Sequence, residues 1–217
     1  MWREVRALII KDIKLEWRQR YSFGGIILYL ASTVFLIYIS FIEMEPNVWV
    51  TLFWIILLFT AVSAVAKSFM QESRARTLYY YSIAHPRSVI LAKLLYNSAM
   101  MVLLAVTGMG IYILMNKSPI SQVGYFIGVV ISGSISFGLA FTMMSAISSK
   151  ATQNITLMAI LCLPFIIPVL LLLIKLTQTA LLDHIEIFPY RDFALLFSLD
   201  IIMILLAVLL FPYLWRD

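Results

Sequence analysis

Charge and cysteine are both scarce in this sequence. Only 12% of its 217 residues are charged, 63% are hydrophobic, and the mean hydropathy is +0.98. Soluble domains carry more charge, about 25%, because their surface must stay polar. The single cysteine, Cys162, cannot form an intramolecular disulfide or a thiolate cluster. The composition therefore excludes an ordinary soluble domain and predicts a chain that is solvated by lipid.

Motifs that bind nucleotides or support hydrolysis are also missing. The sequence contains no G-x-x-x-x-G-K-[ST], so it has no Walker site for ATP. It contains no G-x-S-x-G, H-E-x-x-H or C-x-x-C either. The two histidines, His85 and His184, have no second ligand at metal-site spacing. We therefore expect no catalytic residues and no metal site, and a membrane enzyme is disfavoured because no acid, base and nucleophile converge.

Long apolar runs are what the sequence does contain. An α-helix needs about 20 apolar residues to cross about 30 Å of hydrocarbon, and open sheet edges cannot sit in lipid. The sequence therefore predicts an all-α membrane bundle that forms one domain, 1–217. The predicted transmembrane helices are 22–42, 48–66, 89–115, 120–147, 155–174 and 193–213.

Lys and Arg are distributed unevenly between the two ends of these predicted helices. With the N-terminus in the cytoplasm, twelve of the sixteen basic residues lie on the cytoplasmic side and three on the other, and Lys93 lies inside the third run. Because cytoplasmic loops are rich in Lys and Arg, we expect an inner-membrane protein of bacterial type with both termini cytoplasmic. The net charge of +5 mostly reflects this topology and requires no nucleic-acid partner.

Residues 1–20 predict an amphipathic helix in the membrane interface. Its basic residues recur at spacings of three and four on one stripe, and apolar residues occupy the opposite stripe. The basic stripe is Arg3, Lys11, Lys14 and Arg18 with Ala7, and the apolar stripe is Trp2, Val5, Ile9, Ile13 and Trp17. Two compatible roles fit this helix. In the first, it only anchors the first span to membrane lipid. In the second, it also helps to pack a transporter subunit.

The segment 67–88 is the longest predicted cytoplasmic loop. Glu72 and Arg76 are four residues apart, which favours an ion pair on a helix, and an apolar and aromatic face follows from Thr77 to Tyr81. Pro86 ends any such helix before the third span. A short helix of this kind suits docking into a groove of a soluble partner, although a solvated loop with interfacial tyrosines fits the same residues.

Small residues and prolines inside the apolar runs have more than one interpretation. Small residues recur at a spacing of four, which lets helices approach closely: Gly124, Gly128 and Ser132 form one set, and Gly138 and Thr142 form another. The same seam could line a substrate path or face another subunit. Pro164 and Pro168 would kink the fifth span, which suits a hinge or a helix that lines a cavity.

Ionisable residues are rare in the apolar runs, and such residues can mark an ion path. Asp200 in the sixth run is the main candidate, and we expect it near the outer interface. Lys93, at the start of the third run, is expected to extend to the cytoplasmic surface. A proton-coupled carrier therefore has little support.

The stretch 54–99 resembles the permease subunit of the cytochrome c maturation ABC transporter, the haem exporter protein B family. A second stretch, L-P-F-I-I-P-V-L at 163–170, is similar to the doubled proline of the family's fifth helix, and the six spans agree as well. The chain departs from the family pattern at Arg76, where Gly is usual, and in its Tyr-rich loop with one proline. The matching positions of the first stretch are Trp54, Phe59, Phe69, Glu72, Thr77, Leu78, Pro86, Ala92 and Lys93.

The resemblance implies a type-2 ABC exporter permease without enzymatic activity of its own. A separate cytoplasmic ATPase subunit would bind ATP and Mg²⁺, and a haem-handling membrane subunit, a small helper protein and a second permease copy would complete the complex. Haem would be the substrate of the complex, exported as such or released with a loaded chaperone, and this chain would bind no cofactor. The coupling loop would contact the ATPase through Phe69, Glu72, Arg74, Arg76, Thr77 and Leu78.

Two other functions fit the same residues. A type-2 permease for a glycan, a lipid or a drug would share the loop and the topology. A membrane scaffold that transports nothing would assemble a complex without any ATP-dependent change around Glu72. The subunits that accompany the chain distinguish these functions.

Overall fold

The computed structural model describes residues 2–18, 20–41, 43–70, 85–151, 155–182 and 188–216. All regular structure in these ranges is helical, and six of the helices are long and apolar enough to cross a membrane. The predicted all-α membrane bundle is therefore confirmed. The helices are α1 (Trp2–Arg18), α2 (Arg20–Ser40), α3 (Pro46–Met70), α5 (Pro86–Met115), α6 (Val123–Ala151), α7 (Ile155–Thr179) and α8 (Tyr190–Arg216).

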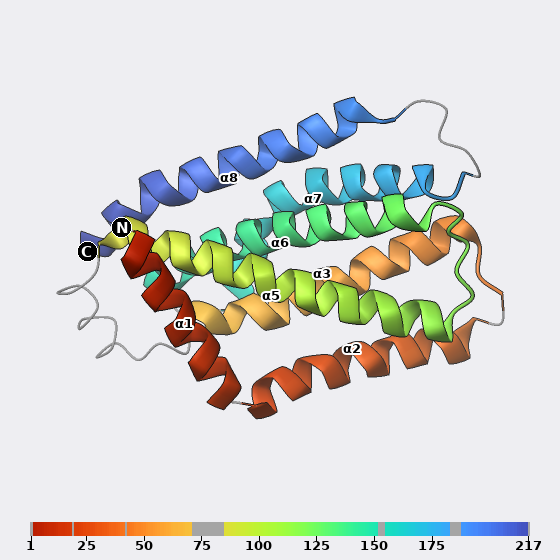
Figure 1. Ribbon diagram of the computed structural model, residues 1–217, viewed down its shortest axis with the longest axis horizontal. Helices are drawn as coiled ribbons and strands as arrows, with labels where there is room; N and C mark the ends of the chain where they lie inside the picture. The colour runs from red at the N-terminus through yellow and green to blue at the C-terminus, as the bar shows by residue number, and fades with distance from the viewer. Residues whose placement is uncertain are drawn as a thin grey trace.

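The central helix of the bundle is α6, which packs against α3, α5, α7 and α8 (Figure 1). Within its apolar segment 78% of the residues are buried, compared with 17% in α2 and 22% in α8. Those two helices lie at opposite edges of the bundle in Figure 1, and both expose large aliphatic side chains. An apolar exterior is the expected surface of a bundle whose solvent is lipid.

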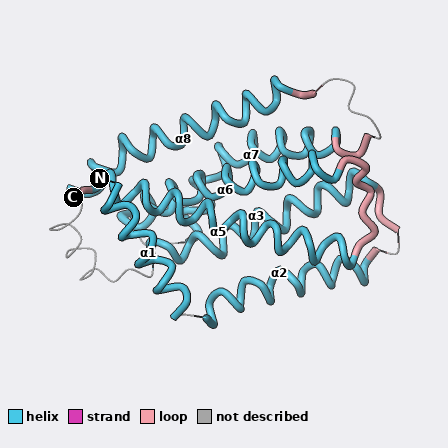
Figure 2. The backbone as a smooth tube through the Cα atoms, in the orientation of Figure 1, coloured by secondary structure: helices cyan, strands magenta, loops and turns pink. Residues whose placement is uncertain are grey.

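The two ends of the bundle are built differently. The N- and C-termini lie at one end, which α1 also crosses (Figure 1). Figure 2 shows most of the described loop residues gathered at the opposite end. The α5–α6 turn lies there, so Lys117 is at the end far from α1.

Aromatic side chains from α3 form the core between three helices. The indole Nε1 of Trp54 donates to Oγ1 of Thr177 in α7 over 2.9 Å. The rings of Trp49 and Tyr112 pack with centroids 4.7 Å apart, and the Tyr112 hydroxyl donates to the backbone carbonyl of Trp49. Large rings supply buried area, and their polar atoms require such partners, so these contacts fix α3 against α5 and α7.

Several helices extend beyond the apolar runs that predicted them. The third span starts at Pro86 rather than after it, because proline lacks an N–H that the first helical turn does not need. The fifth span continues to Thr179, and the sixth begins at Tyr190. Hydropathy detects only the part of a helix in hydrocarbon, so polar turns at helix ends escape it.

The interfacial helix α1 has three faces instead of the two predicted stripes. Val5 and Asp12 are buried against the bundle. Trp2 and Trp17, which the prediction grouped with Val5, are 72% and 73% exposed. The basic residues form the third face. The apolar stripe divides because one part of it packs against protein and the other faces outward.

Candidate functional site

The predicted coupling contacts fall mostly outside the described residues. Glu72, Arg74, Arg76, Thr77 and Leu78 belong to 71–84, which the structure does not describe. Phe69 lies in the last turn of α3. The described helices α3 and α5 end and begin on either side of this segment, at the end of the bundle that α1 crosses (Figure 1). The docking role of these residues stays a prediction.

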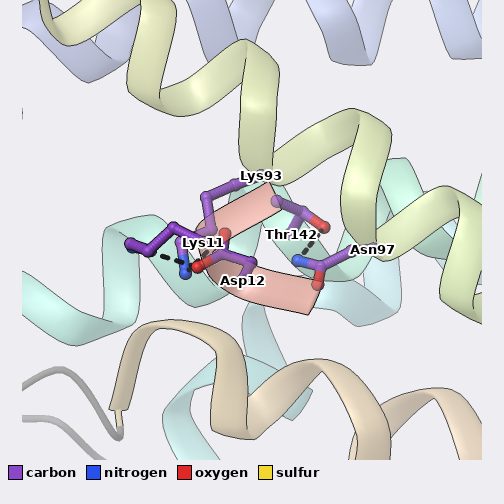
Figure 3. A network of polar contacts seen from close by, with 5 residues as sticks. All are labelled: Lys11, Asp12, Lys93, Asn97 and Thr142. Atoms are coloured by element: carbon purple, nitrogen blue, oxygen red, sulfur yellow. Dashed lines mark hydrogen bonds and ion pairs between the residues drawn. The ribbon is translucent and has the colours of Figure 1, made fainter. Parts of the chain in front are cut away.

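A buried ion pair joins α1 to α5 (Figure 3). Oδ2 of Asp12 lies 3.5 Å from Nζ of Lys93, and its Oδ1 lies 3.0 Å from Nζ of Lys11. Asp12 is 6% exposed and Lys93 5%. Lys93 therefore does not extend to the surface as predicted, because α1 covers it and supplies a carboxylate. Loss of one partner of a buried pair leaves an uncompensated charge, so this contact holds α1 in one position.

A second buried polar contact continues from α5 to α6. Nδ2 of Asn97 donates to Oγ1 of Thr142 over 2.9 Å (Figure 3). Asn97 follows Lys93 by four residues, so both lie on one face of α5. The Thr142 hydroxyl in turn donates to the backbone carbonyl of Gly138. Two separate polar contacts, one turn apart on α5, thus link α5 to α1 on one side and to the central α6 on the other.

The first turn of α1 also lies beside the first turn of α5. The neighbouring Ser88 hydroxyl is the main reason that the pKa of Glu4 lies below its ordinary value. Burial acts in the opposite direction, and the charge and backbone N–H of His85 add to the lowering. His85 is the N-cap of α5 and directly follows the segment 71–84. Helix α1 therefore contacts α5 where the undescribed segment ends and again at Lys93.

Comparison with known proteins decides the family. A protein-family model described as CcmB protein matches residues 3–214, which is nearly the whole chain. The chain belongs to the CcmB family. It is therefore a membrane component of the cytochrome c maturation ABC transporter for haem export, a permease-type chain of the inner membrane that crosses it several times. None of the curated proteins matches it.

In this CcmB-family chain, the predicted close packing of small residues is found at Gly138 but not at Gly124 or Gly128. A Cβ added at Gly124 or Gly128 would have no atom within 4 Å, so these two residues do not pack against another described helix. Close approach occurs at Gly138, where a Cβ would lie 2.7 Å from Cα of Ser98 in α5. At Gly133 it would lie 2.6 Å from the Trp54 ring. The alternative that Gly124 and Gly128 face another subunit stays open.

Both prolines of the predicted hinge lie inside α7, which continues as a helix through Pro164 and Pro168. The side chain of Pro164 is exposed and that of Pro168 is half-buried. Neighbouring polar groups and local adjustments allow prolines in membrane helices. A hinge at these residues stays a prediction for the CcmB-family chain.

The structure places Asp200 in the interior of the bundle. Asp200 is 7% exposed and lies well inside α8, beside Ser136 of α6. Because α8 begins at Tyr190, Asp200 lies further from the end of its helix than the apolar run indicated, and its interfacial position stays a prediction. Ser132, Ser134 and Ser136 are also buried, so α6 presents hydroxyl groups in the interior of the bundle.

Sequence reasoning missed the contacts of Asp12, Asn97 and Thr142. Thr142 stood out only by its spacing of four from Gly138, and Asp12 lies outside both predicted stripes of the first helix. The sequence did contain a signal for one of these contacts. Asp12 is an acidic residue in an amphipathic helix and Lys93 is a lysine inside an apolar run, so the two carry complementary charges. Asn97 and Thr142 gave no such signal, since polar uncharged residues are common in membrane helices.

Proposed function

We propose that this chain is the permease subunit that converts ATP hydrolysis by a cytoplasmic partner into movement of the transmembrane helices. The ATPase docks on the segment 71–84, and the movement drives haem export or release of a haem-loaded chaperone on the outer side. The observation that supports this proposal is the chain of buried polar contacts from α1 through α5 to α6 (Figure 3). Helix α5, which follows the docking segment, takes part in both of these contacts.

The transmission step rests on how these helices pack. A force on the segment 71–84 acts first on α5, whose first turn follows it directly. The pair between Asp12 and Lys93 moves α1 together with α5, and the bond between Asn97 and Thr142 passes the displacement to α6. Packed interiors shift between discrete arrangements rather than deform continuously. Because α6 contacts four other helices, its displacement reaches most of the bundle.

The partners follow from what the chain lacks and from its family. The sequence holds no Walker motif, so ATP and Mg²⁺ belong to a separate ATPase subunit. Membership of the CcmB family supports a haem-handling membrane subunit, a small helper protein and two permease copies in the complex. The shared end of both termini (Figure 1) and the excess of Lys and Arg at that end support a cytoplasmic position for it.

Purification of the tagged chain from its own membrane in mild detergent, with mass spectrometry of the bound subunits, tests the proposal. We expect an ATPase with a Walker motif together with haem-handling membrane subunits. An ATPase with different companions would preserve the permease function and reject the haem assignment. Absence of any ATPase, under conditions that keep known complexes intact, would favour the scaffold function instead.

Reversal of one charge tests the docking segment. We expect Glu72→Lys to weaken association with the ATPase subunit, because a reversed charge in a short docking helix repels the surface that it fitted. Glu43→Lys is the matched control, since Glu43 is exposed in the loop between α2 and α3 at the opposite end. Association is measured as the ratio of ATPase to permease after purification. An unchanged ratio for Glu72→Lys, at normal expression, would remove the segment from the mechanism.

A further inference from the structure

The outward apolar face of α1 places this helix at the depth of the lipid headgroups. Trp2 and Trp17 are more than 70% exposed, and Ile13 is 51% exposed on the same side. Water is a costly environment for such a face, whereas the interface of a bilayer accepts tryptophan rings readily. A second face is buried against the bundle at Val5 and Asp12, and Asp12 pairs with Lys93 of α5. Helix α1 is therefore tethered to the bundle, and its outward face suits contact with lipid.

The remaining face of α1 holds a basic groove of about 420 Å³. Three of its six lining side chains are cationic and three are apolar. Lys14 and Arg18 are exposed, and neither makes an ion pair within the described part of the chain. The lining residues are Ala7, Ile10, Lys11, Lys14, Leu15 and Arg18. We define these six residues as the α1 groove.

We propose that the α1 groove binds an anionic phospholipid from the leaflet that borders α1. The phosphate would lie between Lys14 and Arg18, and Ile10 and Leu15 would contact the glycerol and the first part of an acyl chain. Charge complementarity and the depth of α1 carry this assignment, since basic side chains at the headgroup level attract anionic lipids. It does not rest on the proposed ATPase coupling.

The groove is connected to the buried ion pair through one residue. Lys11 lines the groove and also lies 3.0 Å from the carboxylate of Asp12. A phosphate in the groove would therefore share Lys11 with Asp12. A lipid bound in the groove would then affect the ion pair between Asp12 and Lys93, which holds α1 to α5.

Native mass spectrometry of the purified complex tests the proposal, with phosphatidylglycerol as the probe and phosphatidylcholine of the same acyl chains as the reference. We expect tighter binding of phosphatidylglycerol to the wild type. Lys14→Gln with Arg18→Gln should weaken that binding by about fivefold for each charge removed. The matched control is Arg3→Gln with Arg6→Gln, because both side chains are exposed on α1 but lie outside the groove. This control should bind phosphatidylglycerol like the wild type.

Three results with these variants would overturn the assignment, as would competition by inorganic phosphate. The first is unchanged phosphatidylglycerol binding in the groove variant. The second is an equal loss in both double variants, which would indicate diffuse attraction by the whole helix rather than a site. The third is unchanged lipid binding with loss of a co-purified subunit in the groove variant, which would make the groove a protein-docking surface. Inorganic phosphate at matched concentration should not compete, and competition would contradict a lipid site.

Discussion

Asp12 lies between two lysines, and this asymmetry predicts unequal effects of substitution. Asp12→Asn removes the carboxylate from both Lys11 and Lys93, whereas Lys93→Met leaves Asp12 with Lys11. We expect Asp12→Asn to lower the free energy of unfolding by about 3–5 kcal/mol, as for other broken buried pairs. Lys93→Met should cost less. The measurement is equilibrium unfolding of the full chain in mixed micelles.

An ion pair with one exposed partner serves as the control for that prediction. Lys175 and Asp192 are 2.8 Å apart, and the side chain of Lys175 is 64% exposed whereas that of Asp192 is 12% exposed. Solvent screens such a pair, so Asp192→Asn should cost at most about 1 kcal/mol. If Asp12→Asn and Asp192→Asn lower the free energy of unfolding equally, burial of the α1–α5 pair contributes nothing to stability.

Individual residues were recognised from the sequence more readily than their partners. Lys93 and Asp200 both stood out as charges in apolar runs, yet the sequence indicated the neighbours of neither, and the surface position expected for Lys93 was wrong. The partner of Lys93 comes from α1, far away in the chain, and Asp200 lies beside Ser136 of another helix. Hydropathy describes a residue against its sequence neighbours, so it cannot supply a contact between helices.

At the scale of helices, the packing of α6 predicts unequal effects for substitutions at two of its glycines. A Cβ at Gly138 would lie 2.7 Å from Cα of Ser98, whereas at Gly128 it would meet nothing within 4 Å. Gly138→Ala must push the helices apart and should cost about 1–3 kcal/mol of unfolding free energy. Gly128→Ala should leave the stability of the isolated chain unchanged, again measured by unfolding in micelles.

The same two variants bear on the assembly. If Gly128→Ala reduces the yield of the complex without destabilising the isolated chain, Gly128 faces another subunit, which is the alternative that the sequence left open. Equal stability of Gly138→Ala and the wild type would show that α5 and α6 are not in close contact at Ser98.

The helix α1 shows what amphipathic periodicity can and cannot supply. The pattern correctly predicted a helix over residues 2–18 with basic and aromatic side chains on its outer faces; its position in the membrane interface stays a prediction. It did not separate Val5, which packs against the bundle, from Trp2 and Trp17, which face outward. A helical wheel sorts side chains by polarity, and lipid and protein interior are equally apolar, so the third face becomes visible only with the bundle in place.

For the whole molecule, composition and hydropathy were sufficient to predict the architecture. Each of the six apolar runs corresponds to a long helix because lipid allows few other structures. The order in which helices pack around α6 was not predictable. The sequence does not indicate which helix a small or hydroxyl side chain such as Ser136 contacts. The segment 71–84, on which the predicted partner contacts lie, is outside the described residues, so its role rests on resemblance and on charge spacing.

The orientation of the molecule in the membrane gives the last prediction. Arg87 and Lys117 are exposed at opposite ends of α5, and the charge distribution assigns the Arg87 end to the cytoplasm. We expect an impermeant maleimide to label Lys117→Cys in intact cells, and Arg87→Cys only after the membrane is permeabilised. The native Cys162 is 1% exposed inside α7, so the parent chain should give a low background. The reverse labelling pattern would place α1, its groove and the docking segment outside the cell. A cytoplasmic ATPase could then not reach the docking segment.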